Sequence, residues 1–207
     1  MSDPADGSYC VMCSKPATQR CTQCRSQIYC GKQCQKSDWR VHKQLCSSYQ
    51  QFQTPPHENA RRAIVFEQDK PIVRFKWVTI EIKYEEDEYP CSWESPILEE
   101  YFGPGSNGRP GSFNNNVIRG RRLRNTIDLR FRDTFLIDGS PINQAVAAVA
   151  PAEGGPVWCG PLIALKHDNS GSAFITDPPY THMEMGDLRE VVDYLVTYGR
   201  PYQPFRS

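Results

Sequence analysis

The residues of this chain that could carry chemistry are concentrated in one short segment. Seven of the nine cysteines and one of the four histidines lie between Cys10 and Cys46, spaced C-x2-C-x7-C-x2-C-x5-C-x3-C-x7-H-x3-C. Zinc prefers four thiolate or imidazole ligands in a tetrahedron, and a structural site fills all four positions with protein side chains. The segment therefore predicts two structural Zn²⁺ ions, with the ligands Cys10, Cys13, Cys21, Cys24, Cys30, Cys34, His42 and Cys46.

A disulfide-bonded secreted module is the alternative interpretation of the same cysteines. Seven cysteines would leave one thiol unpaired, whereas His42 completes the count for two metals. The first residues, MSDPADGSYC, have neither the positive nor the apolar region of a secretory signal peptide. Clustered cysteines in a reducing compartment are usually metal ligands. We therefore expect zinc rather than disulfides, and an intracellular protein, nuclear or cytoplasmic.

The spacing alone does not say how the ligand pairs are shared, because a sequential arrangement would also complete both sites. The segment YCGKQCQKSDWRVHKQLC, together with all eight ligand positions, resembles the MYND zinc finger over residues 10–46. The resemblance implies a cross-braced arrangement of the two sites. Zinc 1 would be held by Cys10, Cys13, Cys30 and Cys34, and zinc 2 by Cys21, Cys24, His42 and Cys46.

Two fully ligated zinc ions leave no open position for a substrate, so we expect function on the surface of the finger. The resemblance to MYND fingers implies binding of short proline-rich peptides. Such peptides are already extended and dock on an aromatic ledge. The resemblance assigns this ledge to Trp39 and a hydrogen bond with the peptide backbone to Gln35. Ser26 and Ile28 are added because segment 26–29 could offer an unpaired strand edge. The alternative is that Trp39 only packs the core of the finger.

Short elements must position these residues. Segment 26–29 predicts the second arm of a hairpin, and Gly31 opens a short helical turn that carries Cys34 and Gln35. Asp38 is the predicted N-cap of a separate helix that carries Trp39, His42 and Cys46, because an aspartate side chain can accept a hydrogen bond from the first turn.

The 207 residues are enough for the finger and one further domain of ordinary size. Residues 1–9 predict a disordered N-terminus. Residues 47–62 are polar with a Pro-Pro step and predict a linker, with the domain boundary between Gln50 and Asn59. Residues 63–207 predict a mixed α+β domain whose function the sequence does not indicate.

The strands of this second domain follow from alternation of apolar and polar residues. Segments 71–84 and 126–133 alternate as half-buried strands do, and 157–167 predicts a buried strand. Strands and helices are mixed without regular β-α-β order. The predicted fold class is therefore α+β, a cross-braced zinc finger followed by a mixed domain.

The helices and loops follow from caps and breakers. Ser95 is the predicted N-cap of a short helix, and the segment 144–150 predicts another. The segment 187–199 is the strongest helix, opened by a capping-box-like pair that begins at Asp187. Residues 103–116 are rich in glycine, proline and asparagine and predict a long flexible loop.

Charge bears on the choice of partner. The formal net charge is zero, with +4 in residues 1–54 and −4 in the remainder. Seven thiolates around two Zn²⁺ ions bring the finger segment near +1, which argues against a nucleic-acid surface. The alternative function is a nucleic-acid-binding regulator that uses the finger and RGRRLR at 119–124. No apolar run approaches the ~18 residues that span a membrane, so we expect no membrane partner. The oligomeric state is not indicated.

Three features could suggest catalysis, and each has a simpler explanation. WCGPL at 158–162 resembles a thioredoxin site, but Leu162 stands where the second cysteine would be needed. The Asn-His step of SET-type methyltransferases does not occur. His57, His167 and His182 are not accompanied by a nucleophile motif. We therefore expect an adaptor rather than an enzyme. The adaptor would capture proline-rich peptides of partner proteins in transcriptional regulation or protein turnover.

Overall fold

A computed structural model describes residues 9–85, 91–151, 157–169 and 178–198. Most of the N-terminal segment predicted to be disordered lies outside these residues. Tyr9 is described, and it forms an isolated β-bridge with Pro16. Among the described residues, no helix has the length and apolar character that a membrane crossing requires.

The finger consists of a two-stranded hairpin and one helix. Strands β1 (Gln19–Arg20) and β2 (Ile28–Tyr29) pair antiparallel, as the sequence predicts for the second arm. Helix α1 (Lys32–Cys46) is continuous, so the prediction of a new helix capped by Asp38 is wrong. The Asp38 carboxylate is buried and accepts a hydrogen bond from the Tyr29 hydroxyl at 2.7 Å. It binds a side chain across the finger instead of the first turn of a helix.

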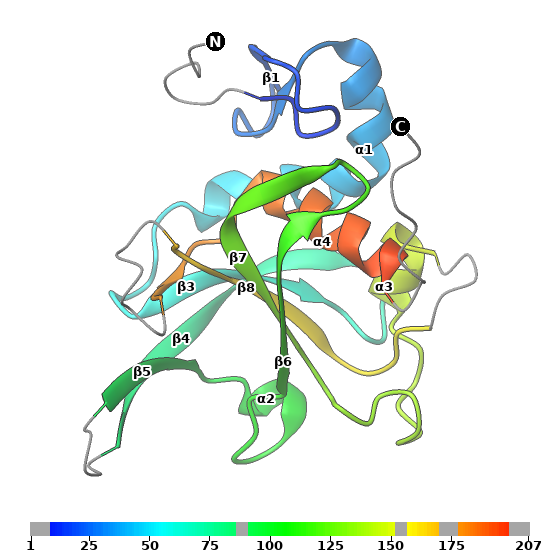
Figure 1. Ribbon diagram of the computed structural model, residues 1–207. Coiled ribbons are helices and arrows are strands. Elements are labelled where there is room, and N and C mark those ends of the chain that lie inside the picture. Colours follow the sequence, from blue (N-terminus) through cyan, green and yellow to red (C-terminus); the bar gives the residue numbers. More distant parts are fainter. Residues whose placement is uncertain (1–8, 86–90, 152–156, 170–177, 199–207) are drawn as a thin grey trace.

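A curled antiparallel sheet of seven strands forms the centre of the rest of the chain (Figure 1). Its main path has the order β5-β4-β3-β8-β7-β6, and β9 pairs with β8. The strands are β3 (Ala60–Phe66), β4 (Val73–Glu85), β5 (Cys91–Pro96), β6 (Arg109–Asn116), β7 (Arg121–Phe131), β8 (Leu162–His167) and β9 (Tyr180–Thr181).

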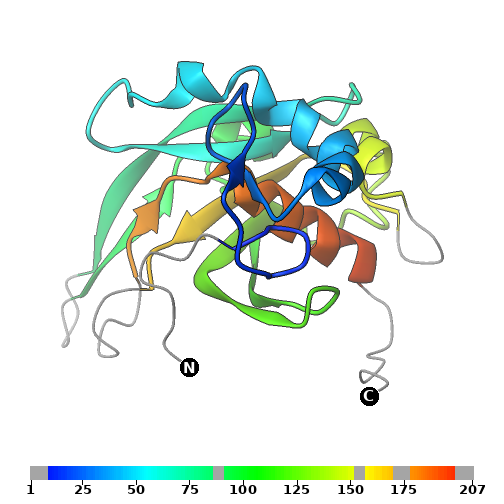
Figure 2. The same ribbon diagram turned by 90° about the horizontal axis from the view of Figure 1, so that it is seen from above.

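Three helices gather over one face of this sheet, which confirms the α+β class (Figures 1 and 2). Helices α3 (Gln144–Val149) and α4 (Met185–Thr197) lie against the strands, and α1 of the finger packs on α4. Alternation along the strands sorts their side chains between the faces. Ile64 and Phe66 of β3 join the core under the helices, whereas Ala63 and Val65 join a smaller core on the opposite face.

Two predicted strands and two predicted helices are confirmed. Strand β4 covers most of 71–84, and β7 contains much of 126–133 but begins earlier, at Arg121. Helix α3 begins after Asn143, whose side-chain oxygen accepts a hydrogen bond from the Val146 amide at 2.9 Å. Helix α4 is capped one turn earlier than predicted, by the pair Glu184 and Asp187.

The predicted loop at 103–116 is wrong over most of its length, because Arg109–Asn116 is strand β6. Gly111 of β6 allows the neighbouring strand to approach closely. A Cβ built at Gly111 would lie 2.8 Å from Cε1 of Phe131 on β7. The predicted cap at Ser95 is also wrong, since this residue belongs to β5. The short helix nearby is α2 (Glu99–Phe102), which Leu98 precedes.

Residues 47–62, which the sequence predicts to be a linker, contain two pieces of regular structure. These are the 3-10 helix η1 (Tyr49–Phe52) and the first residues of β3. Arg62 is buried, donates to the Phe52 carbonyl, and pairs with Glu184 at 2.6 Å. One apolar core runs from the finger through η1 to the sheet and α4, so the finger is packed on the rest of the chain.

Candidate functional site

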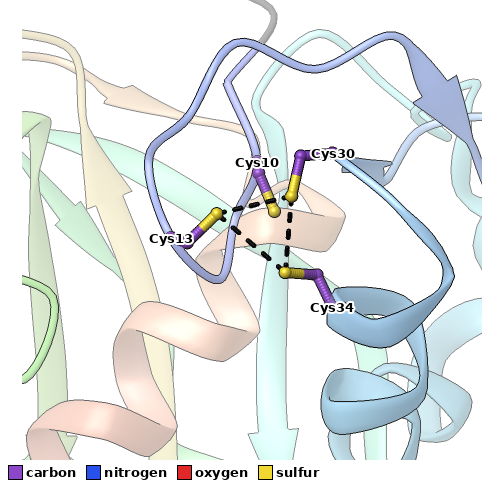
Figure 3. Close-up of side chains that lie close together, drawn as sticks. All are labelled: Cys10, Cys13, Cys30 and Cys34. Atoms are coloured by element: carbon purple, nitrogen blue, oxygen red, sulfur yellow. Dashed lines mark hydrogen bonds between the residues drawn. The ribbon is translucent and has the colours of Figure 1, made fainter.

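The first ligand cluster joins the start of the finger to the start of α1. Cys10 and Cys13 lie on the turn before β1, Cys30 follows β2, and Cys34 is on the first turn of α1. Figure 3 shows their four sulfur atoms pointing toward one another. The sulfur of Cys30 is 3.5 Å from those of Cys13 and Cys34, and Cys13 and Cys34 are 3.9 Å apart.

The second cluster joins the β1–β2 turn to the last turn of α1. The sulfurs of Cys21 and Cys46 are 3.7 Å apart, and the Cys24 sulfur is 3.8 Å from Nε2 of His42. All four residues are buried, unlike the half-exposed first cluster.

Both clusters have the dimensions of a structural zinc site. A zinc–sulfur bond of about 2.3 Å in a tetrahedron implies sulfurs roughly 3.8 Å apart, and the ligand atoms of each cluster lie within 4.8 Å of one another. The two cofactors are therefore structural Zn²⁺ ions. Each cluster takes one ligand pair from the first half of the segment and one from the second, so the metals brace the hairpin against α1.

The two C-x2-C turns are built alike. Ser14 and Arg25, which follow the second cysteine of each turn, both have φ of 57°. Their amides donate to the carbonyls of Cys10 and Cys21, each at 2.9 Å. This left-handed residue closes the turn so that both sulfurs of a pair point to the same side. The sequence predicts the ligands but not this backbone conformation, because neither residue is glycine.

The backbone of the first site favours a thiolate at Cys10. Burial alone would raise the pKa of this thiol, but the backbone amides of Cys30, Met12 and Cys13 outweigh burial and lower the pKa to about 7. A hydrogen bond with the Cys30 thiol instead raises the pKa of Cys34 to about 12.

In the second site, burial and the neighbouring Cys21 thiol raise the pKa of Cys46 to about 12. Burial lowers the pKa of His42, so its imidazole is neutral, as a zinc ligand must be. Crowded thiols of this kind lose their protons together only when a cation replaces them, which is the expected chemistry of a zinc site.

The surface residues assigned to peptide binding occupy two different places. Trp39 and Gln35 lie one turn apart on α1, and the Trp39 ring is 46% exposed with its centre 5.9 Å from that of His42. Ser26 and Ile28 line a cleft of about 730 Å³ between the finger and β7, and neither Trp39 nor Gln35 lines it.

The expected free edge of β2 is partly used within the finger. Arg20 pairs with Ile28 on one side, and the Ile28 carbonyl accepts the Val11 amide at 3.3 Å. The Gln27 carbonyl likewise accepts the Cys21 amide at 2.9 Å. These two carbonyls are already bonded, so the edge argument for Ser26 and Ile28 is weakened.

Half of the basic segment 119–124 holds the finger in place. Arg119 donates to the Met12 carbonyl at 2.8 Å and pairs with Asp193 at 2.7 Å. Arg121 donates to the Val11 carbonyl at 2.9 Å and pairs with Glu190. Because Asp193 and Glu190 are on α4, these arginines connect the finger backbone to that helix.

A buried ion pair completes this interface. The Arg189 guanidinium of α4 approaches the Asp38 carboxylate of α1 to 2.6 Å, and both side chains are buried. Arg40 donates to the Val149 carbonyl of α3 at 3.1 Å. The pattern of charges in the sequence does not reveal these pairs, since the partners are far apart along the chain.

The candidate catalytic residues are not assembled into one site. Cys159 is half-buried and followed by strand β8 rather than a helix. His182 accepts the Arg62 amide at 3.1 Å, and Nε2 of His57 lies 3.4 Å from the Thr79 hydroxyl. His167 lies in a different cluster, which sequence reasoning missed.

That cluster surrounds the buried Asp128 on the face of the sheet opposite the helices. Asp128 accepts from Arg130 at 2.8 Å and from the Tyr180 hydroxyl at 2.9 Å, and His167 lies 3.8 Å away. Burial alone would raise the pKa of Asp128, but the neighbouring His167 side chain and the charge of Arg130 outweigh burial and lower the pKa. The period-2 pattern of β7 places Asp128 and Arg130 together on one face, which is the signal available in the sequence.

The finger segment of the chain matches a known family. Residues 10–46 match the model of the MYND finger. Dauer abnormal formation protein 25 of Caenorhabditis elegans is 50% identical over 40 residues, 19% of this chain and 10% of that protein. N-lysine methyltransferase SMYD2-B of Xenopus laevis is 38% identical over 50 residues, 23% of this chain and 12% of that protein.

One match is longer than the finger. Ubiquitin carboxyl-terminal hydrolase 19 of Arabidopsis thaliana is 26% identical over 113 residues, 45% of this chain and 17% of that protein. The chain thus spans between 10% and 17% of the length of these three relatives. No solved structure matches the chain.

Proposed function

We propose that this chain, whose residues 10–46 are a MYND finger and therefore a zinc-binding protein-interaction module, is an adaptor that captures short proline-rich segments of other proteins. In this proposal the chain is not an enzyme. Trp39 supplies an aromatic ledge for the extended peptide, and Gln35 hydrogen-bonds its backbone. The two zinc ions hold the ledge in place without touching the peptide.

The exposure of Trp39 is the observation that carries the proposal. A tryptophan that only packed the core of the finger would be buried like its neighbours on α1, Val41 at 3% and Leu45 at 0% exposed. Trp39 is instead 46% exposed. Its ring also lies beside His42, so zinc 2 fixes the helical turn that presents it. A large, rigid and partly exposed aromatic ring is a typical anchor for a peptide.

The names of two relatives support the proposal that the partners of this chain are regulatory proteins. One is named as a ubiquitin hydrolase and another as a lysine methyltransferase. We place the partners of this chain in transcriptional regulation or protein turnover, in the nucleus or cytoplasm. We propose no catalytic activity because the candidate histidines lie apart from one another and because Cys159 is followed by a strand rather than a helix.

A nucleic-acid partner is the alternative that the basic segment suggests. Arg119 and Arg121 are occupied by Asp193, Glu190 and finger carbonyls, which reduces the charge that this segment can offer to phosphates. Salt dependence distinguishes the alternatives, because phosphate contacts make binding fall steeply with ionic strength. Capture of a proline-rich peptide by an aromatic ledge is much less sensitive to salt.

The proposal is tested by substituting the ledge while measuring metal content. Trp39→Ala should weaken binding of a proline-rich peptide by about 2 kcal/mol or more, as loss of an aromatic anchor does. Gln35→Ala should cost about 0.5–1.5 kcal/mol, the range for a neutral hydrogen bond. Gln33→Ala is the matched control, because Gln33 is an exposed glutamine on a different face of α1. It should leave binding unchanged.

Zinc content, measured on the same preparations, separates binding from folding. Neither Trp39 nor Gln35 is a ligand, so both variants should retain two zincs per chain. A Trp39→Ala protein that keeps both ions and binds the peptide as well as the original chain would refute the ledge. Loss of zinc in this variant would instead show that Trp39 has a structural role.

A further inference from the structure

The cleft between the finger and the sheet is a second feature that the proposed ledge does not use. Three walls enclose it: the finger from Tyr9 to Ile28, the N-terminal half of β7, and the first turns of α4. Figure 1 shows β6 and β7 extending toward the finger, next to α4. The cleft has a volume of about 730 Å³, enough for a segment of extended chain.

The acidic side chains of the cleft are already neutralised. Glu184 pairs with Arg62 at 2.6 Å and Asp187 with Lys166 at 2.6 Å. Glu190 pairs with Arg121. Among the described residues that line the cleft, no carboxylate therefore lacks a cationic partner.

Two arginines of the same cleft carry uncompensated positive charge. Arg122 and Arg124 line it and are exposed, and within the part of the chain that the structure describes neither forms an ion pair. They are two positions apart on β7, so their Cα atoms are separated by about 7 Å of extended chain. Leu123, between them, is half-buried and packs against the main core. Alternate residues of a bound strand would have the same spacing.

The backbone at this point also lacks ladder partners among the described strands. Asn115 of β6 pairs with Arg122, but Phe113 pairs with Ile127, so residues 123–126 stand opposite one residue of β6. On the other side, the pairing of β7 with β8 stops at Thr126. A bulge of this kind leaves amide and carbonyl groups for another strand to pair with.

We infer that this cleft binds an acidic, extended peptide segment of a partner protein, with carboxylates at alternate positions that pair with Arg122 and Arg124. Val11, Ile28 and Leu123 give the apolar residues between the carboxylates a surface to pack on. A peptide is favoured over a nucleic acid because residues 123–125 of β7 lack ladder partners among the described strands. The amide and carbonyl groups of a peptide can pair with such a strand, whereas a sugar-phosphate backbone has no amide groups for a ladder.

The inference is tested on the full chain with a fluorescein-labelled peptide of about six residues that alternates glutamate and valine, roughly 20 Å long when extended. We expect it to bind, and a matched peptide with glutamine for glutamate to bind about tenfold more weakly, which is within the range for two exposed ion pairs. The double variant Arg122→Glu with Arg124→Glu should lose about tenfold or more in affinity. Fluorescence anisotropy gives these affinities.

The control variant carries the same change of charge elsewhere. Lys32→Glu with Lys36→Glu alters two exposed lysines of α1 that do not line the cleft, and it should bind the acidic peptide as the original chain does. Amide hydrogen exchange should slow at residues 123–125 when the peptide is bound. Trp39→Ala should keep this binding, so failure of the proline-rich ledge and failure of the cleft are distinguishable.

Four results would overturn the inference. The glutamine peptide could bind as well as the glutamate peptide, or both double variants could lose binding equally. Trp39→Ala could abolish binding, which would place the acidic peptide on the ledge. A single-stranded oligonucleotide could displace the peptide, bind more tightly and depend on Arg122 and Arg124, which would identify the cleft as a nucleic-acid site.

Discussion

At the scale of single residues, ligands that are spaced alike in the sequence differ in how easily they lose a proton. Backbone amides lower the pKa of Cys10 to about 7, after outweighing its burial. The last cysteine of each site is the opposite case, since the pKa of Cys34 and that of Cys46 are both raised to about 12. Zinc must displace the protons of these two thiols.

Zinc binding should therefore release protons and weaken as the pH falls. A thiol with a raised pKa is protonated in the metal-free protein, so added protons favour that form. Below the lowest thiol pKa, affinity should fall by roughly one order of magnitude per pH unit for each proton displaced. The measurements are zinc release to a chromophoric chelator from about pH 7.5 to about pH 5, and titration calorimetry in two buffers. Equal zinc retention across this range would contradict the prediction.

The ligand residues could be predicted from the sequence because a metal imposes its own count and spacing. All eight predicted ligands fall into the two groups that the structure brings together. The left-handed backbone of Ser14 and Arg25 could not be predicted, since asparagine or glycine is the usual signal for it. The partners of Asp38 could not be predicted either, because Arg189 is distant in the chain.

At the scale of elements, the glycines and prolines of 103–116 predict a loop where the structure has strand β6. They usually mark loops, and 103–116 contains four glycines and two prolines. Gly111 has a different role, because the Phe131 ring occupies the space where its Cβ would be. Phe131 in turn contacts Phe135 and Trp158, with ring centres 5.7 and 5.6 Å away. A close approach between strands explains this glycine, and only the three-dimensional structure reveals it.

Gly111→Ala should accordingly destabilise the sheet. The added methyl group would meet Phe131 at 2.8 Å and displace its ring from the aromatic cluster. Overpacking of this kind costs about 1–3 kcal/mol of the free energy of unfolding. Urea unfolding measures the loss. Gly31→Ala serves as the control, because no atom lies within 4 Å of a Cβ built there. A Gly111→Ala protein as stable as the original chain would show that Phe131 has room to move.

At the scale of the whole molecule, the finger and the sheet behave as one packed unit. Residues of both belong to a single apolar core, and the buried pair of Asp38 and Arg189 crosses between them. The sequence predicted separate modules because residues 47–62 look like a linker by composition. The segment is nevertheless tied to both parts: Gln50 donates to the Cys24 carbonyl of the finger at 2.8 Å, and Tyr49 belongs to the shared core.

Removal of zinc should therefore destabilise the entire chain rather than the finger alone. Loss of the finger fold would expose the apolar face of α4 and leave Arg189 without Asp38, and breaking a buried ion pair costs about 3–5 kcal/mol. Thermal unfolding should show one transition both with and without a chelator, and the chelator should move it to a lower temperature. In each sample the transition should be the same in tryptophan fluorescence and in far-UV circular dichroism.

A substitution gives this prediction a second test. Asp38→Asn should keep both zinc ions, because Asp38 is not a ligand, yet still lower the unfolding temperature of the whole chain. If chelation left the transition of the sheet at its original temperature, the two parts would be energetically independent.

The distance in sequence between Asp38 and Arg189 also has a consequence for biosynthesis. The finger has all its ligands once residue 46 has left the ribosome, whereas Arg189 follows Asp38 by 151 residues. At typical elongation rates this interval is about 10 to 30 s. Zinc can be acquired during that time, so the nascent finger becomes a template on which α4, synthesised much later, docks.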